Sequence, residues 1–417
     1  MINNDEKQER LILVSAQKKK NSEIDAWESL DELEELVETA GGTVIRKILQ
    51  RVDHINAALY IGTGKTQEIK ELVIENDATG VVFDDELSPV QMRNLSEEIN
   101  IKIMDRTMLI LDIFASRALS KEGIIQVEMA QLKYQYSRLT GFGEMMSRQG
   151  GGIGSKGPGE KKLELDKRNI KTRMELLKEE LLEVQRHRTL IRDRREKTST
   201  PIVAILGYTN SGKSTLLNQL SGSDIYVKNQ LFATLDPTAR SVVLPSHSEI
   251  LVTDTVGFIR KLSHHLVKAF YSTLEEAKYA DIILHVMDIS SPHIATHQKV
   301  VYETLDKLGI KNIPIIAVYN KIDKHEGIYP KDTLADYEVE ISAKQNINCD
   351  KLLVIIENII YKNMIPFKIS LAYDKQDIVR FCHTYGERIT EDYKDQEICV
   401  EGFMPKDKFY KIEPYKQ

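Results

Sequence analysis

The N-terminal quarter of the chain alternates short apolar runs with stretches whose apolar residues recur at helical spacing. Four runs rich in β-branched residues have the length of strands and lie at 10–14, 43–49, 80–83 and 101–104. Three helical stretches separate them, at 26–39, 65–76 and 88–98. This alternation predicts an α/β domain with a largely parallel sheet over residues 1–117.

A long helical hairpin is predicted next, over residues 118–197. Apolar residues recur there at alternating spacings of four and three, as in a heptad seam, at Ile125, Met129, Leu132, Tyr136 and Leu139 and then at Ile170, Met174, Leu177, Leu181, Val184 and Ile191. Two such helices with a short connection form an antiparallel arm. The connection, 140–159, holds eight glycines in twenty residues. Because glycine costs about 1 kcal/mol per helical position, we expect this tip to be neither helix nor strand.

The arm is basic although the chain is acidic. Residues 131–197 contain 17 Lys and Arg against 10 Asp and Glu, a net charge of +7, so the rest of a chain of net charge −6 carries −13. The cations that flank the tip are Arg138, Arg148, Lys156, Lys161 and Lys162. A basic glycine-rich loop on a long hairpin suits phosphates and irregular RNA. The alternative is a coiled coil with a solvated charged face, or a dimer contact.

The region 201–362 opens with a phosphate-binding loop. The apolar strand 202–206 runs into GYTNSGKS, that is Gly207, Tyr208, Thr209, Asn210, Ser211, Gly212, Lys213 and Ser214, and then into a helix. In this strand–loop–helix context the backbone N–H groups wrap the β-phosphate, Lys213 reaches the β- and γ-phosphates, and Ser214 binds Mg²⁺. A similar GTGKT at 62–66 has Leu59 where the first glycine should stand, and we interpret it as a turn into a helix.

Three further motifs follow in the order of a GTPase, each after a predicted strand. They are Asp254, Thr255, Val256 and Gly257; then Asn320, Lys321, Ile322 and Asp323; then Ser342, Ala343 and Lys344. Asp254 is predicted to hold a Mg²⁺ water, and the Gly257 N–H to meet the γ-phosphate. Asp323 accepts two guanine N–H groups that adenine lacks, which favours GTP over ATP. The last motif would back the base with a main-chain N–H.

The segment between the first two motifs is the candidate switch, and it consists of Phe232, Ala233, Thr234, Leu235, Asp236, Pro237 and Thr238. A threonine here closes over Mg²⁺ and the γ-phosphate in the triphosphate state, and Thr234 and Thr238 are both candidates. Phe258 stands where a Ras-like enzyme orients the attacking water with Gln, so we expect slow intrinsic hydrolysis that a partner accelerates. Asn210 is a candidate K⁺ ligand, or else a residue that stabilises its loop.

The overall composition, the length of the apolar runs and the cysteines limit the class of protein and its cellular location. Apolar residues make up 41% and charged residues 29%, so the chain can build full cores. Its apolar runs fall short of the ~20 residues that span a bilayer, and its three cysteines offer neither a disulfide framework nor metal-ligand spacing. We expect a cytoplasmic monomer, in part membrane-peripheral, without an integral membrane segment. Residues 366–417 predict a small α+β module, so the fold class is multidomain α/β.

Ser147–Glu164 (SRQGGGIGSKGPGEKKLE) and Phe232–Asp236 (FATLD) resemble the HflX family of ribosome-associated GTPases, and the likeness extends over nearly the whole chain. The resemblance implies that the chain binds the large ribosomal subunit, splits stalled or idle ribosomes, and extends its glycine-rich loop towards the peptidyl transferase region. It places the switch threonine at Thr234 rather than Thr238. Lys156 stands where the family often has Arg, and lysine keeps the charge but loses the bidentate fork.

Two other functions are compatible with the residues alone. One is a GTPase whose arm binds a protein or a membrane-bound partner. The affinity of an apolar helix interface would barely change with salt concentration, and this distinguishes it from RNA binding. The other is an ATP-dependent RNA remodeller, against which Asp323 argues at this site. The leading hypothesis is a GTP-driven switch that docks on the large subunit through contacts of the arm tip with rRNA.

Overall fold

The computed structural model describes residues 9–19, 23–149, 158–196, 200–222, 231–232, 238–261, 275–325, 327–362, 364–394, 396–406 and 408–416. Their contacts divide them into two compact units. The N-terminal unit runs to Val184 and also includes the described residues 231–232 and 260–261. The C-terminal unit comprises the described residues from Gln185 onward apart from those two short segments.

A four-stranded parallel sheet forms the centre of the N-terminal unit. Its strands, in spatial order, are β2 (Thr43–Val52), β1 (Arg10–Lys18), β3 (Gly80–Phe83) and β4 (Lys102–Asp105). The helices are α1 (Glu23–Thr39), α2 (Thr63–Glu75), α3 (Pro89–Ile99) and α4 (Arg106–Arg117). The predicted parallel α/β fold is therefore confirmed. The winding of the sheet reverses between β1 and β3, where such folds have a crevice at the carboxyl ends of the strands.

Local chemistry explains where these helices begin. The Ser88 hydroxyl caps α3 by accepting from Gln91 N, and the Gln91 side chain accepts from Ser88 N. Pro89 stands at the first helical position. Gly62 is the N-cap of α2, and Lys65 pairs with Glu68 one turn along that helix. The GTGKT sequence is thus a helix start, as predicted.

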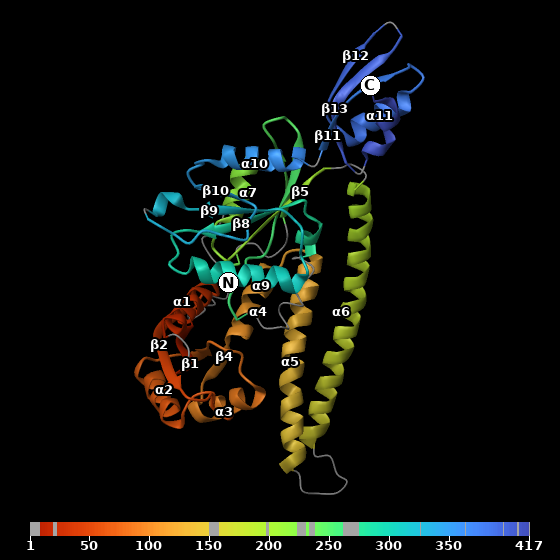
Figure 1. The fold of residues 1–417 in the computed structure, drawn as a ribbon. Coiled ribbons are helices and arrows are strands. Elements are labelled where there is room, and N and C mark those ends of the chain that lie inside the picture. Colours follow the sequence, from red (N-terminus) through yellow and green to blue (C-terminus); the bar gives the residue numbers. More distant parts are fainter. Residues whose placement is uncertain are drawn as a thin grey trace, which may run out of the picture. The chain divides into compact units, whose positions relative to one another are not determined.

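Two long helices, α5 (Lys121–Gln149) and α6 (Pro158–Glu196), form the arm (Figure 1). Arg173 of α6 binds Glu128 of α5 through two bonds, Nε to Oε1 at 2.7 Å and Nη2 to Oε2 at 3.0 Å. On α6 the seam residue Leu177 is 1% exposed, whereas Leu176 next to it is 49% exposed. The heptad spacing therefore identified the packed face of α6.

Two expectations about the arm tip are wrong. Helix α5 continues to Gln149 and α6 begins at Pro158, so residues 140–149 and 158–159 of the predicted tip are helical rather than irregular. Only two of the eight glycines fall in 140–149, and a cost of about 1 kcal/mol each is small against a long helix. Arg138 also does not belong to a basic tip. Its side chain is 13% exposed, and its guanidinium donates to Asp105 Oδ2 at 2.6 Å.

The C-terminal unit contains a six-stranded sheet, parallel except for one edge strand. In spatial order its strands are β10 (Tyr337–Glu340), β9 (Ile315–Asn320), β8 (Ile282–Asp288), β5 (Ile202–Gly207), β7 (Glu249–Asp254) and the antiparallel β6 (Thr238–Val243). Its helices are α7 (Lys213–Ser221), α9 (Ile294–Leu308) and α10 (Cys349–Lys362), with short 3₁₀ turns at Glu275–Tyr279 and Ile322–Lys324. The predicted P-loop architecture is confirmed.

A small α+β module completes this unit. It has the antiparallel strands β11 (Met364–Leu371), β13 (Ile398–Pro405) and β12 (Glu387–Tyr393), helix α11 (Gln376–Tyr385), and 3₁₀ turns at Phe409–Lys411 and Glu413–Tyr415. Arg388 joins the module to α10, because its guanidinium lies 4.5 Å from the Tyr361 ring centroid and bonds Glu357 at 3.3 Å. Across the described residues, no helix is both long and apolar enough to cross a membrane.

Candidate nucleotide site

The loop between β5 and α7 is shaped by two close backbone approaches. A Cβ built on Gly207 would lie 2.3 Å from the Val286 carbonyl oxygen, and one built on Gly212 would lie 2.2 Å from Asn320 Nδ2. Gly212 also has φ +95°, a conformation that costs other residues energy, and it is the N-cap of α7. Glycine is therefore required at both ends of the P-loop.

Lys213 is buried and already directed into the loop. Its ammonium donates to the Tyr208 carbonyl at 2.7 Å. Burial lowers the pKa of Lys213 to about 8; the nearby Asp254 opposes this shift and Lys321 adds to it. Next to it, Ser214 Oγ donates to Asp254 Oδ2 at 2.7 Å, so two of the three predicted metal ligands lie together.

The DTVG segment lies directly against the P-loop. Phe258 N donates to the Gly207 carbonyl at 3.1 Å, and Thr209 N donates to the Phe258 carbonyl at 2.8 Å. A Cβ built on Gly257 would lie 2.9 Å from Lys213 Nζ and 2.9 Å from Thr209 Cα. The Gly257 backbone and the Lys213 ammonium therefore border the same small space.

Within this segment Thr255 and Val256 are buried, and Thr255 Oγ1 donates to the Ile205 carbonyl at 2.8 Å. Two P-loop hydroxyls, Thr209 Oγ1 and Ser211 Oγ, are buried without a hydrogen-bond partner among the described residues. Buried polar groups are normally paired, so unpartnered hydroxyls in a phosphate-binding loop are consistent with a ligand that supplies the partner.

The other two motifs meet at Asn320. This buried side chain donates to the Ser211 carbonyl at 2.9 Å and accepts from Ala343 N at 3.0 Å. It thereby joins the P-loop to the segment Ser342–Lys344. Lys321 donates to the Asn210 carbonyl at 2.8 Å, which ties the P-loop a second time.

The predicted base-reading residue, Asp323, is exposed, and Ser342 orients it by donating to Oδ1 at 2.6 Å. This bond from Ser342 lowers the pKa of Asp323 below its ordinary value, so the carboxylate remains an acceptor. The side chain of Ile322 is half-buried, and Lys344 is exposed. The Ala343 N–H is already used by Asn320, and the predicted main-chain contact with a base stays a prediction.

Part of the predicted switch lies outside the described residues, namely Ala233, Thr234, Leu235 and Asp236. Phe232 is described and belongs to the N-terminal unit, where its buried ring packs edge-on against Phe114 with centroids 4.6 Å apart. Thr238 is exposed at the start of β6.

Sequence reasoning missed two residues that support the site. Asp288 accepts from Lys321 Nζ at 2.6 Å, and the His297 ring stacks on the Tyr208 ring with centroids 3.7 Å apart. Asp288 could have been found, because it ends the buried strand β8 at the edge where the P-loop also lies. Nothing in the sequence around His297 indicates its contact.

Comparison with known proteins agrees with this site and fold. Three family models match in order along the chain: "GTP-binding GTPase N-terminal" at residues 27–115, "GTP-binding GTPase Middle Region" at 117–195 and "50S ribosome-binding GTPase" at 202–321. A protein named GTPase HflX from Lacrimispora saccharolytica is 50% identical over 403 residues, which are 96% of this chain and 95% of that protein. The chain belongs to the HflX family of ribosome-associated GTPases.

Other HflX proteins show similar coverage. The GTPase HflX of Caldanaerobacter subterraneus subsp. tengcongensis is 50% identical, and the match covers 94% of this chain and 90% of that protein. The GTPase HflX of Escherichia coli is 41% identical, and the match covers 73% of this chain and 71% of that protein. A solved GTP-binding protein from Sulfolobus solfataricus in complex with GDP is 26% identical, covering 84% of this chain and 98% of its own, with a TM-score of 0.44. As a member of the HflX family, the chain is a GTPase that binds GTP and GDP and hydrolyses GTP.

Proposed function

We propose that this HflX-family GTPase binds the large ribosomal subunit and acts as a GTP-controlled factor that splits or rescues ribosomes, with hydrolysis stimulated by the ribosome. One observation carries the proposal: a match to a 50S ribosome-binding GTPase at 202–321 stands beside a long two-helix arm, over nearly the full length of HflX relatives.

The proposed work of the site follows from its contacts. Lys213 and the Gly257 N–H border one space and would bind the γ-phosphate together. Ser214 and Asp254, whose oxygens are 2.7 Å apart, would hold Mg²⁺. Their hydroxyl and carboxylate oxygens are ligands that Mg²⁺ prefers, and the proposal adds Thr234 as the residue that closes over the triphosphate. When bound, Mg²⁺ would neutralise negative charge on the phosphates.

Slow hydrolysis by the isolated chain is also part of the proposal. The Phe258 ring is buried and has no polar atom to orient a water. Arg240 donates to Asn218 and Ser221, and Arg260 to Glu28, so both arginines near the switches are engaged elsewhere. The proposal therefore assigns the missing acceleration to the ribosome. A K⁺ role for Asn210 stays a prediction, which equal GTPase rates in Na⁺ and K⁺ would contradict.

The arm is proposed to contact rRNA through its tip. Residues 150–157 carry Lys156 and the glycine run, and they lie outside the described residues. Near the middle of α5, Tyr134 and Arg138 both donate to Asp105, a fully buried carboxylate. The arm is thus anchored to the sheet of the N-terminal unit, as a rigid reach into RNA requires.

The test is GTP hydrolysis by the purified chain with and without large ribosomal subunits, at 50 and 200 mM salt. Binding through six to ten phosphate contacts should weaken by roughly 10³–10⁵ over that range. Tight GTP binding without stimulation at any salt would refute the ribosome assignment and leave the GTPase intact. Salt-insensitive stimulation would indicate a protein contact instead.

A variant pair locates the contact. Replacing Gly150–Gly154 with a neutral linker of equal length should leave intrinsic hydrolysis unchanged and remove ribosome stimulation. The control replaces Lys299 and Lys311 with Ala, two lysines whose side chains are 77% and 71% exposed on the C-terminal unit. If the tip variant is stimulated as well as the control, the tip is not the coupling element.

A further inference from the structure

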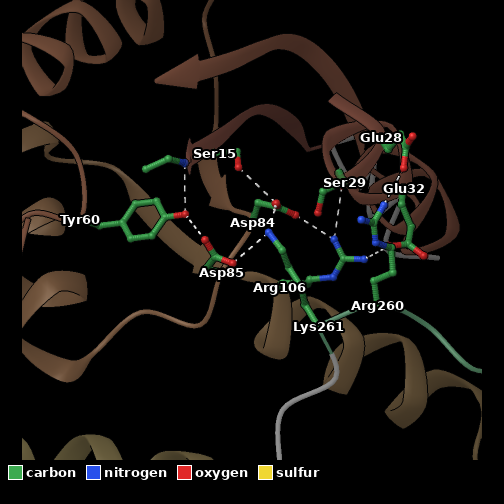
Figure 2. A network of polar contacts seen from close by, with 11 residues as sticks. Ser15, Glu28, Ser29, Glu32, Tyr60, Asp84, Asp85, Arg106, Arg260 and Lys261 are labelled. Carbon is green, nitrogen blue, oxygen red and sulfur yellow. Dashed lines mark hydrogen bonds and ion pairs between the residues drawn. The ribbon is translucent and has the colours of Figure 1, made fainter. Parts of the chain in front are cut away.

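The N-terminal sheet has a crevice at the point where its winding reverses. A cavity of about 460 Å³ lies there, lined by Ser15 and Lys18 from the end of β1 and by Asp85, two residues beyond β3. Sheets of this topology bind ligands at this position. In this chain Arg260 and Lys261 line the same cavity (Figure 2).

Both of these side chains make ion pairs in the crevice. Lys261 Nζ lies 2.5 Å from Asp84 Oδ2 and 2.9 Å from Asp85 Oδ1. Arg260 Nη1 lies 2.9 Å from Glu28 Oε2 on α1. The Asp84 side chain is 0% exposed and that of Glu28 is 11% exposed. The Arg260–Glu28 pair and the Asp84 carboxylate are therefore largely shielded from water, whereas the Lys261 and Asp85 side chains are 36% and 37% exposed. The Arg260–Glu28 pair thus lies outside the class of surface pairs that contribute little.

The charge of the crevice matches two incoming cations. Among the residues labelled in Figure 2, the carboxylates are Glu28, Glu32, Asp84 and Asp85. Among the labelled residues, the cation that comes from residues 9–149 is Arg106, which bonds Asp84 at 2.8 Å and also Glu32. Lys18 and Asp25 line the cavity as well, and their opposite charges cancel. Arg106 alone would leave three negative charges, whereas Arg260 and Lys261 reduce the excess to one. Because an uncompensated buried carboxylate is costly, the crevice favours a dibasic occupant.

Arg260 and Lys261 lie close in sequence to one of the two switch motifs. Arg260 follows Gly257 by three residues, and Gly257 borders the Lys213 ammonium at the P-loop. At the other switch, Phe232 stands two residues before Thr234 and is buried against Phe114 of the N-terminal unit. Described residues beside both switch motifs therefore belong to the N-terminal unit.

We propose that the crevice is a docking site for the Arg260–Lys261 pair, and that this latch makes the GTP-versus-GDP preference of the chain depend on the N-terminal unit. A latch of this kind can shift the equilibrium between nucleotide states only if it binds the segment differently in each state. The inference goes beyond the proposed function, since it concerns the isolated chain and requires no ribosome.

A charge exchange tests it. Glu28→Lys and Arg260→Glu each break the pair, and the double variant rebuilds it in reverse. The readout is the ratio of the Kd for a non-hydrolysable GTP analogue to the Kd for GDP, measured on the full chain. Each single variant should change the ratio by about fivefold or more, in the same direction, which is the lower end of usual allosteric couplings. The double variant should return to within about twofold of the parent.

A matched control lies on the same helix. Lys47 pairs with Asp31 at 2.6 Å and also with Glu34, both on α1, so Lys47→Ala removes ion pairs from α1 without touching the crevice. This variant should keep the parent ratio. An unchanged ratio in both single variants, or a double variant that restores nothing, overturns the proposal.

If the charge-reversal variants do not fold, two milder substitutions test the same proposal. Lys261→Ala and Asp85→Asn alter side chains that are 36% and 37% exposed, so the fold should tolerate them. Each should shift the ratio, and the double variant should shift it no further than Lys261→Ala alone, because that variant already removes the Lys261–Asp85 pair that Asp85→Asn weakens. Fully additive shifts, or none, would overturn the latch.

Discussion

Replacing Asn320 with Ala tests how the nucleotide site is held together. Asn320 is 2% exposed, and its amide links the Ser211 carbonyl to Ala343 N through bonds of 2.9 and 3.0 Å. Alanine removes both bonds and leaves a buried carbonyl and a buried N–H behind. No large shift of charge accompanies the change, so the effect reports the tether itself.

The magnitude follows from the two groups that lose their partner. A buried donor or acceptor left unsatisfied costs about 1–3 kcal/mol, so the two together cost about 2–6 kcal/mol. For a unit of this size, about 2–4 °C of unfolding temperature corresponds to 1 kcal/mol, which predicts a drop of about 4 °C or more. We expect GDP affinity to fall by about tenfold or more, because the P-loop and the 342–344 segment are no longer pre-organised.

Scanning calorimetry and titration of a fluorescent GDP analogue measure these two quantities. The control is Asn94→Ala, the same substitution at a half-buried residue of the N-terminal unit whose amide makes a solvent-exposed bond to the Ala58 carbonyl at 3.0 Å. It should change neither quantity appreciably. The tether argument is refuted if Asn320→Ala keeps an unfolding temperature within about 1 °C, and a Kd within about twofold, of the parent.

Three further outcomes are expected. Gly257→Ala should weaken binding of a GTP analogue more than of GDP in parallel titrations, because its Cβ would lie 2.9 Å from Lys213 Nζ, where the γ-phosphate is expected; equal losses would contradict this. The pKa of Lys213 is depressed to about 8 in the chain without nucleotide, so its ammonium loses the proton as the pH rises through that value. In the complex, the bound phosphates keep Lys213 protonated. GDP affinity should therefore fall between pH 7 and 9, approaching tenfold per unit above pH 8, and a flat profile would disprove it. Lys65→Ala should leave nucleotide affinity unchanged in the same titration, because Lys65 pairs with Glu68 inside α2; a loss would revive the GTGKT sequence as a phosphate site.

The parts of the fold that can be predicted from the sequence are those set by residues a few positions apart. The strand at 80–83 and the capped helix after Ser88 follow from apolar runs and from capping residues three positions apart, and both occur as expected. The P-loop was predictable for the same reason, since its glycines and Lys213 are consecutive in the chain. Glycine content over 140–159 overestimates the extent of the irregular tip, because the glycines cluster after Gln149, where α5 ends.

What the sequence by itself determined is the order of the secondary-structure elements, the fold class and the nucleotide motifs, because spacing and turn chemistry act over a few residues. What only the tertiary structure decided is the partner of each charged side chain. Arg138 looked like part of a basic tip until Asp105, 33 residues away, proved to hold it. Arg260 pairs with Glu28 across 232 residues, and no local pattern can choose that partner. Such pairs depend on which strands end at the same edge of a sheet, and only the folded arrangement of the strands decides that.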